Sequence, residues 1–117
     1  MKFLPLILIL FVGCAAVPFE GWSKADTIRE VTFQGLNAVD WVQTQRIASD
    51  PCYIELNPIL GENPSRQSVD LFMLGVGVVH LTVSGFLEPV FWRPAWQYLG
   101  IGSKGATVVW NYREGVR

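Results

Sequence analysis

Charged residues are scarce in this chain. They make up 16% of its 117 residues, whereas a soluble domain typically carries about 25%. The positive charges form no basic run and the formal net charge is −1, so nucleic acid is not an expected partner. Half of the residues are hydrophobic, and the mean hydropathy is +0.31. A chain of this length has room for one domain, and its composition favours a membrane protein.

Residues that commonly carry catalysis or bind metals are also few. His80 is the only histidine, and with dispersed carboxylates it makes no ligand cluster of recognised spacing. The serines offer no nucleophile-elbow pattern. The glycine-rich stretch from Gly100 to Ala106 lacks the spacing of a phosphate-binding loop. We therefore expect no catalytic residue, no metal and no cofactor.

The first 18 residues have the order of an export signal. Lys2 precedes an apolar run from Phe3 to Val12, and small residues follow; such a run is short for a spanning helix, which needs about 20 residues. The tetrapeptide FVGC resembles a bacterial lipobox and makes Cys14 a lipidation candidate, although Phe11 replaces the usual leucine. Three outcomes stay open: lipidation at Cys14, cleavage after Ala16, or retention as an N-terminal anchor. Residues 19–117 then form a single helical membrane domain.

Three further segments are expected to be helical. Residues 26–48 begin with a capping-box pattern, Thr27-x-x-Glu30. Residues 69–87 follow a cap at Ser65 and are the clearest span, since about 1.5 Å per residue carries them across a hydrocarbon layer of about 30 Å. Residues 94–112 form either one helix, which we favour, or two parts separated by a turn at Gly102–Gly105. The predicted fold class is all-α: a small membrane bundle of about three helices after the signal.

Polar residues gather on one side of the first two of these helices. Asn37, Asp40 and Thr44 share one side of residues 26–48, and an apolar strip from Ile28 to Val42 occupies another. We therefore predict a polar seam between the helices. Its candidate binding residues are Asn37, Asp40, Thr44, Glu55, Asn57 and His80.

The depth of the polar residues limits which of them can pair. In an antiparallel hairpin of the first two helices, Asp40 lies about 9 Å from the level of His80, at about 1.5 Å per residue. Gln34 or Asn37 is expected closer to that level. His80 is therefore expected to make a structural hydrogen bond between helices rather than a direct pair with Asp40.

The segments LNAVDWVQTQRIA and ELNPILGENPS, followed by an apolar helix that carries a histidine, resemble a group of small bacterial and phage membrane proteins of unknown function. The resemblance spans about Leu36 to Leu87 and rests on Asp40, Thr44 and the Glu55-x-Asn57-Pro58 turn. It implies a small polytopic membrane protein and supplies no activity.

Two classes of function are compatible with these features. The first is a non-enzymatic integral protein of the bacterial inner membrane, such as a phage-encoded lysis or exclusion factor or a membrane accessory subunit. Its expected partners are membrane lipid, another copy of the chain or another membrane protein. The second is a periplasmic lipoprotein anchored only through Cys14. Acid–base chemistry within the membrane, by His80 with Asp40 and Glu55, ranks third.

Overall fold

The computed structural model describes residues 18–116, which form three helices joined by two loops. Helix α2 runs Lys24–Ser49, α3 runs Arg66–Phe86 and α4 runs Trp92–Arg113. The all-α class is confirmed for this range, which contains no strand. Cys14 and nearly all of the predicted export signal lie outside the described residues.

The starts of the first two helices are set by serine caps. Ser23 caps α2: its hydroxyl accepts from the Asp26 N–H, and the Asp26 carboxylate accepts from the Ser23 N–H. The capping box predicted at Thr27-x-x-Glu30 is therefore wrong, because Ser23 and Asp26 form it one turn earlier. The predicted cap at Ser65 is confirmed, and α3 begins three residues earlier than expected.

Helix α4 continues without a break through its glycines. The alternative with a turn at Gly102–Gly105 is therefore wrong. Glu88 caps the N-terminal end of this helix, because its carboxylate accepts hydrogen bonds from the N–H groups of Val90 and Phe91. Those N–H groups have no partner within the helix itself. Pro94 fits in the first turn, where a missing N–H is tolerated.

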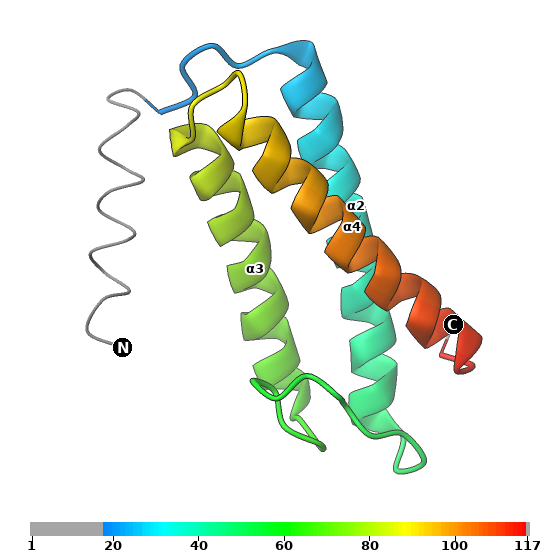
Figure 1. Cartoon of the computed structure of the whole chain (residues 1–117). Coiled ribbons are helices and arrows are strands. Elements are labelled where there is room, and N and C mark those ends of the chain that lie inside the picture. Colours follow the sequence, from blue (N-terminus) through cyan, green and yellow to red (C-terminus); the bar gives the residue numbers. More distant parts are fainter. Residues whose placement is uncertain (1–17, 117) are drawn as a thin grey trace.

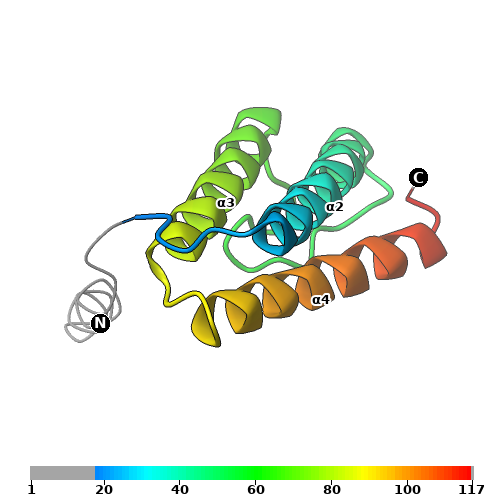
Figure 2. The ribbon, with the colours of Figure 1, turned by 90° about the horizontal axis from the view of Figure 1, so that it is seen from above.

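Helix α2 packs against both of the others, and α3 and α4 contact each other less. Figure 1 shows that α3 and α4 are close at the 87–91 loop and diverge toward the 50–65 loop. Seen from above in Figure 2, α4 crosses one side of the pair formed by α2 and α3. The bundle is therefore splayed open at one end.

The polarity of the bundle is inverted relative to an ordinary soluble domain. Within residues 18–116, ten buried side chains are polar or charged and seven, Pro64 included, are apolar. The apolar strip of α2, which includes Ile28, Val31, Val39 and Val42, points outward. The polar strip of the same helix faces α3 and α4 instead.

Among the described residues, only α3 is long and apolar enough to cross a membrane by length and composition. Its apolar window has a mean hydropathy of 1.7, and only 33% of that window is buried within the bundle. The remainder of this helix presents leucine and valine side chains to the surroundings.

Candidate functional site

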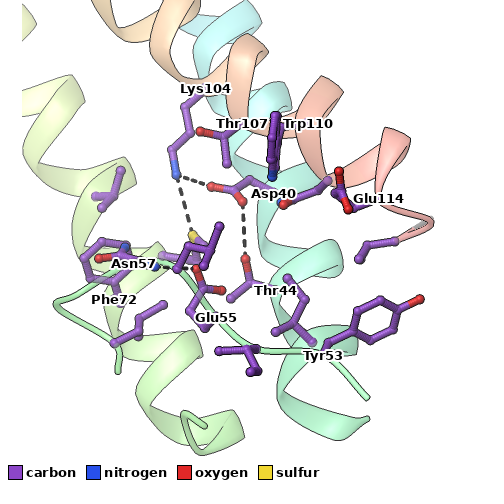
Figure 3. A pocket seen from close by; sticks show the side chains of 18 of the residues that line it. Asp40, Thr44, Tyr53, Glu55, Asn57, Phe72, Lys104, Thr107, Trp110 and Glu114 are labelled. Carbon is purple, nitrogen blue, oxygen red and sulfur yellow. Dashed lines mark hydrogen bonds and ion pairs between the residues drawn. The ribbon is translucent and has the colours of Figure 1, made fainter. Parts of the chain in front are cut away.

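A cavity of about 880 Å³ lies at the open end of the bundle, where α3 and α4 diverge and the 50–65 loop passes beneath them (Figure 3). All three helices and the loop contribute to its walls. The side chains that α3 contributes are apolar, those of α2 and α4 are mostly polar, and the loop contributes both kinds. The polar and charged residues of the lining are Asp40, Thr44, Glu55, Asn57, Ser103, Lys104, Thr107, Asn111 and Glu114.

An ion pair crosses this cavity from α4 to α2. The Lys104 ammonium donates to the Asp40 carboxylate over 2.5 Å, and Thr44 donates to the other Asp40 oxygen over 3.2 Å. The Met73 sulfur lies 3.7 Å from the same ammonium. Only 13% of the Lys104 side chain and 6% of the Asp40 side chain are exposed. The pair is therefore largely shielded, but it remains part of the cavity wall.

The 50–65 loop presents a second carboxylate to the cavity. The Asn57 N–H donates to Glu55 Oε1 over 2.9 Å, and the Ile59 N–H donates to Asn57 Oδ1 over 3.0 Å. Pro58 favours an extended conformation for Asn57. These local bonds hold the half-buried Glu55 side chain toward the hollow, as Figure 3 shows. The loop therefore both connects two helices and contributes to the site.

The structure divides the predicted polar seam into two sites. Asp40, Thr44, Glu55 and Asn57 all line the cavity. His80 belongs to a separate buried cluster nearer the 87–91 loop. Asn37 lies between the two sites, where its side-chain amide donates to the Met73 carbonyl.

Glu30 is the centre of the second cluster. His80 Nδ1 lies 3.0 Å from both Glu30 oxygens, and because a carboxylate only accepts, Nδ1 must carry the proton. Gln34 also donates to Glu30, and Ser84 and Gln97 donate to its other oxygen. The expectation that Asp40 and His80 do not pair directly is correct, but Glu30 rather than Gln34 or Asn37 is the partner.

The imidazole of His80 lies between two aromatic rings. Its plane stacks on Phe33 at a centroid distance of 3.5 Å and on Trp96 at 5.1 Å. His80 Nε2 is buried and has no hydrogen-bond partner. A Cβ at Gly100 would come within 2.5 Å of that nitrogen, so the glycine permits the close approach of α4.

Arginines close the bundle at its other end. Arg93 is 1% exposed and donates to Asp26 and to the carbonyls of Ser84 and Glu20. Arg29 also pairs with Asp26. Asp26 is thus held between two guanidinium groups, which joins the start of α2 to the start of α4.

Sequence reasoning missed Glu30, Arg93 and Gln97, and it did not place Lys104 in the site. The spacing along α2 carried a signal, because Asp26, Glu30 and Gln34 repeat at intervals of four and extend the strip already recognised further along the helix. Nothing comparable marked Arg93 or Gln97, because their roles depend on how α4 lies across α2.

An apolar groove of about 630 Å³ joins the cavity along the gap between α3 and α4. Its walls include Leu71, Val79 and Leu99, and His80 and Trp96 lie toward its closed end. Phe72, Val76, Ser103 and Lys104 line both hollows. The cavity and the groove are therefore neighbouring parts of one continuous surface.

Comparison with protein-family models, with curated proteins and with solved structures finds no match to this chain. No group of three or more histidine, cysteine or carboxylate side chains suited to a metal occurs among residues 18–116. The cavity offers paired charges and amide and hydroxyl groups, an arrangement suited to binding.

Proposed function

We propose that this chain is a small integral protein of a bacterial inner membrane that acts by binding within the bilayer rather than by catalysis. In this proposal all three helices cross the membrane, with their polar faces turned toward one another. The cavity that contains Asp40, Glu55 and Lys104 is the binding site. The observation that carries the proposal is the inverted polarity of the bundle.

Inverted polarity favours lipid over water as the surrounding medium. A soluble domain places its apolar side chains inside, yet here polar groups fill the interior and valines and leucines cover the outside. Each buried polar group is costly in an apolar medium unless it has a partner, and Glu30, Asp40 and Arg93 are all partnered. α2 is too polar to face lipid on all sides, but its outward face is apolar.

The lengths and charges of the helices are consistent with this arrangement. Helices of 21, 22 and 26 residues extend about 32 to 39 Å at about 1.5 Å per residue, enough for a hydrocarbon layer of about 30 Å. An isolated lysine at the bilayer centre costs at least about 2.5 kcal/mol. The bond from Lys104 to Asp40 offsets that cost.

The distribution of exposed positive charges suggests an orientation. Arg46, Arg66 and Arg113 are exposed at the end that holds the cavity. Lys24 is exposed at the opposite end, where Arg93 is buried. Under the positive-inside rule the cavity end faces the cytoplasm.

Carbonate extraction of the Cys14→Ala variant tests the proposal. An integral bundle stays in the membrane pellet after an alkaline carbonate wash and dissolves only in detergent. Release into the wash would contradict the proposal and favour the lipoprotein alternative, in which Cys14 is the sole anchor. A peripheral protein of the same membranes is the control, because carbonate must release it.

One observation favours a second candidate function, acid–base chemistry within the membrane. Glu30 orients the His80 ring through Nδ1, and Nε2 has no partner. In this candidate the oriented ring presents Nε2 to a bound group as the atom that exchanges the proton. A cellular phenotype of the gene that survives His80→Ala unchanged would exclude this candidate.

A further inference from the structure

We propose that the groove and the cavity together bind one phospholipid with a primary ammonium headgroup. The inference rests on the proposed function, because it takes the open side of the groove to face the bilayer. The acyl chains would lie in the groove between α3 and α4, and the headgroup would enter the cavity. Phe72, Val76, Ser103 and Lys104, which line both hollows, mark the junction.

The groove has the shape and chemistry of a site for an apolar chain. Its volume of about 630 Å³ lies within the range of about 300–1,000 Å³ that is usual for ligand sites. Apolar side chains of α3 and α4 form its long walls. At Gly75 a Cβ would meet nothing within 4 Å, so this position leaves the groove open. Leu71, Val79 and Leu99 of its walls are exposed, so a lipid can enter the groove from the side. Helices α3 and α4 diverge toward the 50–65 loop (Figure 1).

The cavity has an excess of negative charge. Asp40, Glu55 and Glu114 contribute three carboxylates to its lining, and Lys104 contributes one ammonium. Asp40 is matched by Lys104, which leaves Glu55 and Glu114 to attract a cation. A primary ammonium also supplies N–H donors for the carboxylate and the amide oxygen presented by the 50–65 loop.

Lys104 favours a zwitterionic headgroup over a simple cation. Its ammonium has three N–H donors, of which one is directed to Asp40. It lies where groove and cavity meet, the position that a lipid phosphate would occupy between its chains and its amine. In a phosphatidylethanolamine the phosphate pairs with Lys104 and the ammonium pairs with Glu55 and Glu114. A phosphatidylglycerol has no cationic group for these two carboxylates and brings only a negative charge toward them.

Native mass spectrometry of the full chain in detergent tests the inference. The protein is titrated with phosphatidylethanolamine, phosphatidylcholine and phosphatidylglycerol that carry identical acyl chains. We expect one phosphatidylethanolamine per chain, bound at least about tenfold more tightly than phosphatidylglycerol. Equal binding of the three lipids would overturn the inference. Displacement by free phosphoethanolamine as effectively as by the lipid would overturn the role of the groove.

Two pairs of variants locate the site. Gly75→Leu fills the groove and should lower lipid binding about tenfold, whereas Gly102→Leu, at an exposed glycine outside the groove with equally open space, should not. If Gly75→Leu fails to fold by circular dichroism, Val79→Trp fills the same groove. Glu55→Gln should remove the preference for phosphatidylethanolamine, and Glu62→Gln in the same loop should retain it. Unchanged binding in the groove variants would overturn the inference.

The inference and the proposed function can fail separately. A protein that resists carbonate extraction but retains no lipid contradicts the lipid site and leaves the membrane proposal intact. A protein that carbonate releases contradicts both.

Discussion

The Lys104 ammonium donates a hydrogen bond to the Asp40 carboxylate, and this bond joins α4 to α2 across 64 positions of sequence. Both side chains are largely buried, and Thr44 adds a second bond to Asp40. The pair therefore contributes to holding the bundle together as well as forming one wall of the cavity. Substituting one or both of these residues should therefore change the free energy of unfolding in a way that shows whether the two side chains are coupled.

Removing the charge of one partner of this pair should lower the free energy of unfolding more than removing both charges. A buried charge left without its partner typically costs about 3–5 kcal/mol. We expect Asp40→Asn to lower the free energy of unfolding by about 3 kcal/mol, at the lower end because Lys104 is slightly exposed. The double variant Asp40→Asn/Lys104→Met should be more stable than Asp40→Asn alone. Unfolding by denaturant in detergent gives the free energy of unfolding of the wild type, the two single variants and the double variant. If the losses of the two single variants add up to the loss of the double variant, Asp40 and Lys104 are not directly paired.

Glu30 should be the most sensitive position of the second cluster. Its carboxylate accepts from His80, and Ser84 and Gln97 also donate to it. Glu30→Ala leaves His80 Nδ1 without a partner, whereas Ser84 and Gln97 keep their bonds to the carbonyls of His80 and Asp26. We expect a loss of about 3 kcal/mol in the free energy of unfolding. Val31→Ala is the neighbouring control, since Val31 points outward and should change stability by less than about 0.5 kcal/mol. Similar losses in the two variants would contradict the central role of Glu30.

Glu88 should make stability depend on pH in the acidic range. The N–H groups of Val90 and Phe91 donate to its carboxylate and hold the pKa of Glu88 below its ordinary value of 4.5. The stabilisation is therefore complete above the ordinary pKa and is lost as the pH falls through the lowered pKa of the folded chain. Thermal unfolding of wild type and Glu88→Gln should differ at pH 7 and converge at low pH.

The control for this pH dependence is Glu20→Gln, at an exposed glutamate in the segment that precedes α2. Its melting temperature should follow that of the wild type across the same range. A constant difference between wild type and Glu88→Gln at every pH would contradict the capping role of the Glu88 carboxylate.

Cys52 provides a natural probe of orientation, because it is exposed in the 50–65 loop. In the Cys14→Ala background we expect a membrane-impermeant maleimide to label Cys52 in inverted vesicles and not in intact spheroplasts. Val90→Cys, in a Cys52→Ser background, places the probe in the opposite loop and should show the reverse pattern. Labelling of both positions from one side would contradict a bundle that crosses the membrane.

The sequence predicted the helices well because their signals are local. Ser65 and the apolar run after it define α3, and the polar and apolar strips of α2 follow from helical periodicity alone. The cavity residues Asp40, Thr44 and Glu55 could be selected because polar groups stand out in a chain with few charges.

The partners of these residues could not be predicted in the same way. That Lys104 pairs with Asp40 depends on the continuity of α4 through its glycines and on its crossing of α2. The pairing of His80 with Glu30 depends on the relative depth of two helices. Gln34 lies closer to His80 than Asp40 does, as expected, and donates to the Gly77 carbonyl, but the sequence did not indicate that Glu30, one turn earlier, is the partner. Such offsets arise from packing between helices, which no single segment encodes.

Accessibility of the outer helix faces tests the central claim, that these faces lie against lipid, most directly. In a Cys14→Ala/Cys52→Ser background, spin labels replace Val39, Leu74 and Val109, one on the exposed face of each helix. In reconstituted membranes the account predicts strong relaxation of all three labels by oxygen, which concentrates in the bilayer, and little relaxation by a water-soluble nickel chelate. Strong relaxation by the nickel chelate with little by oxygen would place these faces in water and contradict the account.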